Sequence, residues 1–487
     1  MTTRPSLPVP LSAALLCLAS LTLALPASAA DDPALARRIA AVERGLLPAV
    51  SIAGAPPARR VLAEEMARLG VPGASIAVIH AGEIEWARGF GVVTPGGAPV
   101  TPATLFQAAS ISKPVTAMAA LKMVESGQLA LDRDINGYTT LWKLPKDMDN
   151  SPVTLRQLLS HTAGTTVHGF PGYAAGSKVP TLVQLLNGAK PANTRGVHVS
   201  TRPGTKWRYS GGGYQVVQYV MTERAKTPFP QLLQDSVLKP LGMNDSSFAQ
   251  PLPPALLSRA ALPHDDHGKP IAGGPHTYPE LAAAGLWTTP SDLARFAIEI
   301  KRSAAGQSNK VLSQSMTQLM LTPVMDNYGL GLGIDGEGQA QSFSHGGSNA
   351  GYQNTMVAYT ERGDGVVVMT NGDRGGELAS QLVRAVAAEY KWPTMQGKER
   401  AAVPVTPAAL AALPGKYTVG NLGDFTVERS GEGLKVALRG DAFEPLYAGA
   451  DGSYFVTSRE AELRFTGRDG GGRLKAGSLD VEFARAK

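Results

Sequence analysis

Residues 104–121 read TLFQAASISKPVTAMAAL, an extended-looking segment that runs into a predicted helix. Ser110 opens this helix and Lys113 follows three residues later, so the two side chains share one helix face. The Ser110 hydroxyl would also lie beside the free N–H groups of the first helical turn. Pro114 is compatible with a helix only because it falls in that first turn. The S-x-x-K arrangement therefore suits proton transfer between a lysine and a serine nucleophile.

The chain contains the S-x-x-K pattern twice and the G-x-S-x-G pattern not at all. The second S-x-x-K, Ser236 with Lys239, falls late in a predicted helix that Pro240 ends, and we interpret it as coincidence. The absence of G-x-S-x-G excludes the commonest nucleophile turn of α/β-hydrolases. Because S-x-x-K alone is also typical of an ordinary helix cap, the interpretation of Ser110 depends on other segments.

A glycine-rich loop further along the chain offers a second candidate group, the phenol of Tyr209. This residue begins the sequence Tyr-Ser-Gly at residues 209–211, just before a predicted helix. Such a loop can bring the phenol against Ser110, and an adjacent ammonium such as that of Lys113 favours the phenolate, a usable base. Taken alone, Tyr209 would equally well pack its ring beneath the loop.

A predicted strand ends at His345, and Gly346 and Gly347 follow it. Two glycines in succession let a substrate approach the backbone closely. The next N–H, that of Ser348, could complete an oxyanion hole together with the N–H of Ser110. An isolated H-G-G is otherwise typical of a hairpin bulge with a surface histidine.

In this order, the three segments resemble the motifs of the serine β-lactamase and penicillin-binding-protein superfamily, in particular its class C β-lactamase, esterase and D-aminopeptidase branch. SISK at residues 110–113 is similar to the first motif, and YSG at residues 209–211 is similar to the Y-x-N motif. HGG at residues 345–347 is similar to the K-T-G motif in the H-x-G form of esterase-like members. The flanking stretches LRQLLSHTAG at 155–164 and AGLWTTPSDLARF at 284–296 are also similar to that superfamily.

The resemblance spans residues 57–390 and implies an acyl-transferring serine hydrolase. It implies that Ser110 attacks an ester or amide carbonyl while Tyr209 with Lys113 accepts its proton. The substrate- and oxyanion-binding residues that it implies are Gly211, His345, Gly346, Gly347 and Ser348. It implies neither a metal nor a cofactor.

Two residues depart from the family's pattern. Gly211 stands where the family usually has asparagine, so a side-chain amide that would bind substrate and hold the lysine is missing. His345 replaces a lysine, and a histidine would hold a substrate carboxylate only weakly at neutral pH. The histidine argues against an efficient β-lactamase and toward an esterase or amidase. The glycine keeps open an alternative, a non-hydrolytic receptor for penicillin or peptidoglycan fragments.

The substrate stays open among short esters, D-amino-acid peptides and β-lactams, because the pocket shape depends on loops around Tyr173, Trp207 and Trp287 that the sequence does not place. His-Asp-Asp-His at residues 264–267 has metal-compatible side chains, but prolines and glycine surround it, which predicts a solvated loop. His161 could belong to a catalytic triad, although the resemblance implies a structural hydrogen-bonding role for it.

The patterns of helices and strands, with the resemblance, predict an α/β (α+β) fold. We expect a β-lactamase-like antiparallel sheet flanked by helices, with a helical insert, over residues 55–395. A proline-containing linker at 396–412 and a small lipocalin-like β-barrel at 413–487 follow. The expected strands of the first domain are residues 74–80, 83–89, 342–345, 355–359 and 366–370, and the expected helices are 57–69, 110–126, 155–160, 214–224, 229–238, 291–301 and 377–390.

Residues 1–30 have the pattern of a signal peptide, and residues 31–54 form a short N-terminal segment. We therefore expect an exported protein, periplasmic or secreted, without a stable membrane anchor. The one cysteine of the 487 residues, Cys17, lies in the predicted signal peptide, so cysteine chemistry and disulfides are excluded from the mature chain. The formal net charge of +6 is spread without a Lys/Arg run, which argues against nucleic acid as a partner.

Overall fold

Residues 1–2, 32–56, 58–147, 150–420, 423–438, 442–466, 470–476 and 479–486 are described by a computed structural model of the chain. The signal peptide predicted over residues 1–30, apart from its first two residues, lies outside the described residues. The chain divides into two units, residues 1–40 and 41–487, and α1 (Pro33–Glu43) crosses their boundary. Every described strand belongs to the second unit.

A six-stranded antiparallel sheet forms the centre of the second unit and confirms the predicted sheet. β2 and β9 are almost wholly buried, as continuous apolar runs in central strands should be. A two-residue turn, Ala81 and Gly82, joins β2 to β3, and both residues have positive φ as a tight hairpin requires. In spatial order the strands are β3 (Glu83–Gly91), β2 (Gly73–His80), β9 (Gly365–Thr370), β8 (Tyr352–Tyr359), β7 (Ser342–Asn349) and β6 (Gly333–Asp335).

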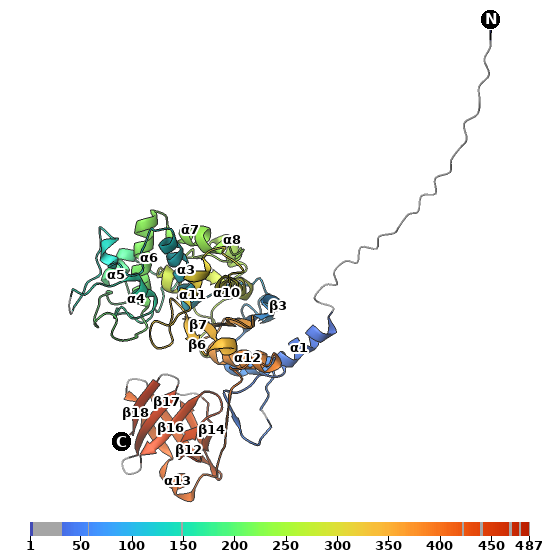
Figure 1. The fold of residues 1–487 in the computed structure, drawn as a ribbon. Helices are drawn as coiled ribbons and strands as arrows, with labels where there is room; N and C mark the ends of the chain where they lie inside the picture. The colour runs from blue at the N-terminus through green and yellow to red at the C-terminus, as the bar shows by residue number, and fades with distance from the viewer. Residues whose placement is uncertain are drawn as a thin grey trace. The chain divides into compact units, whose positions relative to one another are not determined.

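Two helices from distant parts of the chain, both labelled in Figure 1, pack against this sheet, and a third helix packs against one of them. α12 (Gly375–Glu389) contacts β8 and β9, and α10 (Pro290–Ala304) contacts β2 and β9. α2 (Leu62–Leu69) packs against α12. The sheet is therefore assembled from the two ends of the predicted hydrolase domain, as the sequence pattern indicates.

The predicted helical insert lies between β3 and β6 in the chain and is drawn mainly in cyan and green in Figure 1. Its α3 has buried residues on every face, because it runs through the middle of the hydrophobic core. Among the described helices, none combines the length and the hydropathy that a bilayer-spanning segment requires. The helices of the insert are α3 (Ser112–Glu125), α4 (Leu155–Leu159), α5 (Leu182–Asn187), α6 (Gly211–Ala225), α7 (Phe229–Leu233), α8 (Pro254–Leu257), α9 (Leu281–Ala284), α10 and α11 (Gln314–Met320).

The segment predicted as a linker contains regular structure. β10 (Lys398–Arg400) pairs in parallel with β1 (Val50–Ile52), and α13 (Pro407–Ala412) follows it. The Thr406 hydroxyl accepts a hydrogen bond from the Ala409 N–H and so caps α13. Proline content alone indicated a linker, whereas the strand arises from a partner about 350 residues earlier that no local pattern reveals.

The C-terminal strands close into an antiparallel barrel in which each strand neighbours the next along the chain, which confirms the predicted barrel. β11 pairs with β18 to close it. β14 and β17 have weak strand patterns, because EPLYA contains a proline and GGRLKA contains two glycines and two cations. The strands are β11 (Gly415–Thr418), β12 (Asp424–Ser430), β13 (Gly433–Leu438), β14 (Glu444–Ala448), β15 (Tyr454–Phe455), β16 (Ala461–Thr466), β17 (Gly471–Ala476) and β18 (Leu479–Arg485).

Aromatic side chains fill the interior of this barrel. The rings of Tyr417 and Phe425 stack with their centroids 4.8 Å apart, and Phe483 contacts Phe425 edge to face at 5.0 Å. Phe465 contacts Tyr417 and Phe483 in the same cluster. A small barrel whose lumen is occupied by side chains is a packed core.

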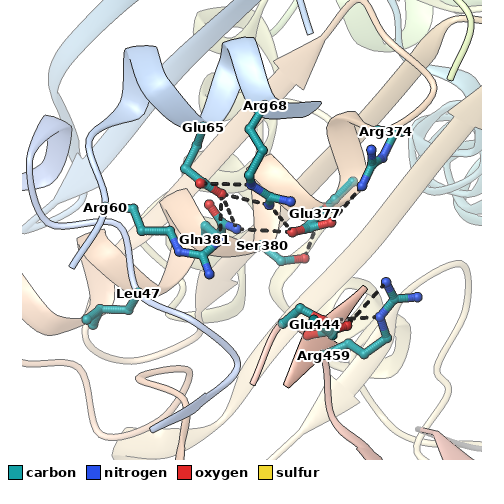
Figure 2. Close-up of polar contacts among 12 residues, drawn as sticks. Leu47, Arg60, Glu65, Arg68, Arg374, Glu377, Ser380, Gln381, Glu444 and Arg459 are labelled. Carbon is teal, nitrogen blue, oxygen red and sulfur yellow. Dashed lines mark hydrogen bonds and ion pairs between the residues drawn. The ribbon is translucent and has the colours of Figure 1, made fainter. Parts of the chain in front are cut away.

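A buried carboxylate, Glu65, ties α2 to α12 (Figure 2). Arg68 donates a hydrogen bond of 2.9 Å to Glu65, Arg60 one of 3.1 Å, and Gln381 of α12 one of 2.9 Å. Burial alone would raise the pKa of Glu65, but the hydrogen bonds from Arg68 and Gln381 and the nearby Arg60 lower it below its ordinary value. Arg68 also pairs with Glu377, so the network extends to the start of α12.

Candidate active site

Ser110 lies in a single 3₁₀ turn, Ala109–Ile111, that leads directly into α3. Ala109 has a φ of +52°, a left-handed conformation that costs an L-residue about 1–2 kcal/mol. The Ser112 hydroxyl holds this turn, because it donates to the Ala109 carbonyl at 2.6 Å and accepts from the Leu286 N–H at 3.0 Å. The strained turn thus sets Ser110 at the start of a helix, as the sequence indicated.

Lys113 is buried, with 2% of its surface exposed, and its Nζ lies 2.9 Å from Ser110 Oγ. The same ammonium donates to the Ala283 carbonyl, also at 2.9 Å. Ala283 belongs to the short helix α9, whose carbonyls also accept from Thr116 and Asn349. A serine hydroxyl and a desolvated amine in direct hydrogen-bond contact can exchange a proton.

Tyr209 is half-buried beside this pair, with Lys113 Nζ 4.9 Å from its ring centroid. Its loop is held by Ser210, whose hydroxyl donates to the Thr166 carbonyl at 2.7 Å and accepts from the Gly213 N–H at 3.1 Å. Ser210 thereby caps α6, which begins at Gly211, three residues before the predicted start. The glycine-rich loop therefore brings the phenol next to the ammonium.

His161 supports this loop. Its ring lies 4.3 Å from the ring of Tyr209, and its Nδ1 accepts a hydrogen bond from the Ser210 N–H at 3.2 Å. Burial, reinforced by the nearby Lys113 cation, holds the pKa of His161 well below its usual value, so the imidazole is neutral. A neutral imidazole can accept at Nδ1, which is the structural hydrogen-bonding role that the resemblance implied.

The predicted strand end at His345 is wrong, because β7 stays paired with β8 as far as Asn349. Within this strand, Gly347 approaches the Ser110 turn. A Cβ atom on Gly347 would lie 2.1 Å from the Ala108 carbonyl oxygen, so a residue with a side chain does not fit without backbone movement. β6 pairs only with residues 342–344 of β7, so no strand in the described part of the chain lies beside Gly346 and Ser348 on that side. Ser348 pairs with Gln353 of β8 on the other side. A carbonyl substrate can therefore approach this part of β7 along its free edge.

His345 lies inside the same site, with its ring 6.2 Å from that of Tyr209. Its Nδ1 is 2.6 Å from the Gly346 carbonyl oxygen, to which it donates. Burial first, and the Lys113 cation second, lower the pKa of His345 to about 3, against a weak opposing effect of that hydrogen bond. The imidazole is therefore uncharged at neutral pH and supplies no cation for a substrate carboxylate.

The other histidine segment does not belong to this site. His264 is fully buried, and its ring contacts the Asn371 carbonyl at 2.9 Å and the Thr94 hydroxyl at 3.3 Å. The prediction of a solvated loop is wrong for His264, because this segment pairs with Gly372 at the end of β9. Within the described part of the chain, no group of three or more His, Cys, Asp or Glu side chains could hold a metal ion.

Three amides that the sequence did not single out join β7 and β8 to the segment before Ser110. Asn349 donates to the Gln107 side chain at 2.8 Å, and Asn354 donates to the Gln107 carbonyl at 2.8 Å. Gln107 in turn donates to the His276 carbonyl at 2.8 Å. Isolated amides in strands carry no local signal, so only their pairing across the fold identifies them.

Glu280, directly before α9, is fully buried, and neither of its carboxylate oxygens has a partner on another described residue. Burial raises the pKa of Glu280 to about 7. In the unfolded chain the Glu280 carboxyl ionises near pH 4.5. Between that pH and about 7, the folded state therefore retains a proton that the unfolded state loses. Folding stability therefore falls across this window and stays lower above it.

We expect Glu280→Gln to flatten this pH dependence, since an amide does not ionise. The loss of unfolding free energy between pH 4 and pH 8 should be about 3 kcal/mol smaller in the variant than in the parent, as a shift of this size implies. Urea unfolding at both pH values measures it. Glu337→Gln, at an exposed loop position, is the matched control and should behave as the parent. Equal pH dependence in Glu280→Gln and the parent would contradict the assignment.

Comparisons with known proteins agree with this geometry. The sequence pattern of the family described as Beta-lactamase matches residues 58–391. Protein flp of Staphylococcus aureus (strain N315) is 26% identical over 235 residues, which are 48% of this chain and 44% of flp. Esterase EstB of Burkholderia gladioli is 32% identical over 211 residues, which are 41% of this chain and 52% of EstB. The chain thus spans about half the length of these curated relatives.

Likeness of fold extends further than likeness of sequence. The structure of the octameric penicillin-binding protein homologue from Pyrococcus abyssi superposes on this chain with a TM-score of 0.57 at 21% sequence identity. The superposition covers 86% of this chain and 98% of the homologue. The overall architecture is therefore shared over most of both chains.

Proposed function

This chain belongs to the beta-lactamase family, and on that premise we propose that it hydrolyses an ester or amide through an acyl-enzyme on Ser110. The observation that carries the proposal is the 2.9 Å contact between Lys113 Nζ and Ser110 Oγ at a helix start. Tyr209 beside the ammonium supplies a second proton-transfer group. The name of the relative EstB, an esterase, supports this class of reaction.

In the proposed reaction, Ser110 Oγ attacks the carbonyl carbon while its proton passes to the Lys113 and Tyr209 pair. The carbonyl oxygen becomes an oxyanion, which the N–H groups of Ser110 and Ser348 hold. Collapse breaks the bond to the leaving group, which takes the proton. Water then attacks the ester on Ser110, and the same pair accepts a proton from the water and passes it to Ser110 Oγ. The bond between Oγ and the acyl carbon breaks, which releases the acid and the free serine.

We propose neutral esters or amides as the preferred substrates within the wider class of short esters, D-amino-acid peptides and β-lactams. The support is the uncharged, buried His345 in the middle of β7. A substrate carboxylate beside His345 would meet no charge on the imidazole, so part of its desolvation cost would stay uncompensated. Efficient hydrolysis of β-lactams, which carry a carboxylate, is therefore not part of the proposal.

We also propose that the protein is exported, either to a periplasm or to the exterior. The support is the sequence of residues 1–30, with Arg4 before an apolar run and Ala-Ser-Ala at 27–29. Its substrate would then be a small molecule encountered outside the cytoplasm.

Labelling with a fluorophosphonate probe tests the proposed nucleophile. We expect one adduct per chain, and peptide mass spectrometry should place it on Ser110, because among the hydroxyls that the structure describes only this one contacts a buried amine at a helix start. Ser236, the serine of the second S-x-x-K, should stay unlabelled. A label elsewhere would contradict the proposal. A stable adduct with penicillin, without turnover of any ester, would instead favour the non-hydrolytic receptor.

A further inference from the structure

Gly211, the first residue of α6, leaves a space that the ring of Phe170 fills. A Cβ atom built on Gly211 would lie 2.6 Å and 2.9 Å from two atoms of this ring. These distances are shorter than van der Waals contact, so any side chain at position 211 would have to displace the ring. Phe170 is half-buried and lies two residues after His168, whose ring is 5.1 Å from that of Tyr209. Because Gly211 lies two residues after Tyr209 in the chain, we infer that the ring lies on the Tyr209 side of the candidate active site.

The loop that carries Phe170 is fixed at its far end as well. His276 Nδ1 donates to the Pro171 carbonyl at 3.0 Å, and the Tyr278 hydroxyl lies 3.4 Å from the same oxygen. The Tyr278 hydroxyl also accepts a hydrogen bond of 2.9 Å from the N–H of Ala350, two residues after Ser348. The loop thus links the Tyr209 segment to the end of β7, and Phe170 lies between these two anchors.

The Phe170 ring changes the chemistry of the surface beside Gly211. A side-chain amide at position 211 would offer a hydrogen-bond donor and an acceptor, whereas a phenylalanine ring offers neither. Contact of the Phe170 ring with an apolar substrate group is favourable, whereas contact with a polar group that has no partner is unfavourable.

We propose that Phe170 is a specificity-determining residue, for which Gly211 makes room, and that it selects substrates with an apolar aliphatic or aromatic substituent next to the scissile bond. This inference rests on the proposed function. The apolar substituent can belong to the acyl part or to the alcohol part of the ester. Two series of substrates distinguish these two positions.

The test compares Phe170→Ala with the unchanged full chain on p-nitrophenyl esters of increasing acyl length and on acetate esters of increasing alcohol length. In one of the two series, the ratio of kcat/KM for the six-carbon ester to kcat/KM for the two-carbon ester should be about ten-fold lower in Phe170→Ala. Loss of a hydrophobic contact implies a change of this size. Phe443→Ala, a phenylalanine 42% exposed beside the barrel, is the matched control and should keep the preference. Unchanged preference in both series would overturn the inference.

Two further variants and one labelling measurement keep the result interpretable. Gly211→Ala should weaken the same preference, because its Cβ pushes the ring away, and it serves if Phe170→Ala does not fold. Phe170→Leu should restore most of the preference lost in Phe170→Ala. Fluorophosphonate labelling of Ser110 in each variant separates the two proposals. No labelling of the unchanged protein would remove the proposed function, whereas normal labelling with unaltered preference removes only the role of Phe170.

Discussion

Replacing Ser110 with alanine is expected to lower ester turnover at least about 10⁴-fold, because the variant lacks the atom that forms the acyl-enzyme. The backbone N–H groups at Ser110 and Ser348 persist in the variant, so a small residual rate over water is compatible with the proposal. Initial rates with p-nitrophenyl acetate measure turnover, and the fluorophosphonate adduct should disappear in parallel. The thermal midpoint should change little, since the Ser110 side chain is only partly buried.

Ser236→Ala is the matched control for this experiment. Ser236 is the other serine in an S-x-x-K pattern, but its hydroxyl donates to the Leu232 carbonyl at 2.6 Å within its own helix. The same atom is thus removed from a site where the hydroxyl has a local partner, and the variant should retain full turnover. Undiminished turnover in Ser110→Ala, or a comparable loss in Ser236→Ala, would show that Ser110 is not the nucleophile.

Replacing Lys113 with methionine is expected to slow acylation roughly 10³-fold, within the range that proton transfer by a positioned group supplies. Methionine keeps much of the length and the apolar stem of lysine but removes the ammonium that contacts Ser110 Oγ and the Ala283 carbonyl. The burst of p-nitrophenol in a single turnover measures acylation. Lys239→Met, at the second S-x-x-K, is the control and should leave the burst unchanged.

Tyr209→Phe, measured in the same way, decides how the two groups share the proton. A near-normal burst would assign the base to Lys113. A loss comparable with that of Lys113→Met would mean that the phenol and the ammonium act as one coupled unit. A normal burst in Lys113→Met would contradict the proposed role of the lysine.

Much of the fold was predictable because its elements have local signals. The hairpin of β2 and β3 follows from two apolar runs around Ala81 and Gly82, and α12 follows from helical spacing at the end of the domain. The sequence did not reveal features that depend on a partner far away in the chain. β10 exists because β1 lies beside it, and His264 is buried because its segment pairs with Gly372.

The candidate site also combines features that the sequence predicts with features that only the tertiary structure reveals. The proximity of Ser110 and Lys113 is a property of helix geometry, since residues three apart share a face wherever the helix lies. The amino-acid sequence alone therefore specified this pair, and its neighbouring motifs indicated which further residues to consider. Nothing in the sequence could show that Phe170 fills the space above Gly211, or that burial leaves Glu280 with a pKa near 7.

Those features depend on contacts between residues far apart in the chain, and such contacts exist only after the hydrophobic core has formed. Asn349 meets Gln107 across 242 residues, and Gly347 meets the Ala108 carbonyl across a similar separation. Burial then sets the charge state of His345. Local spacing is encoded residue by residue, whereas desolvation and close approach are properties of the packed molecule, so the tertiary structure alone decided the chemistry of the walls around Ser110.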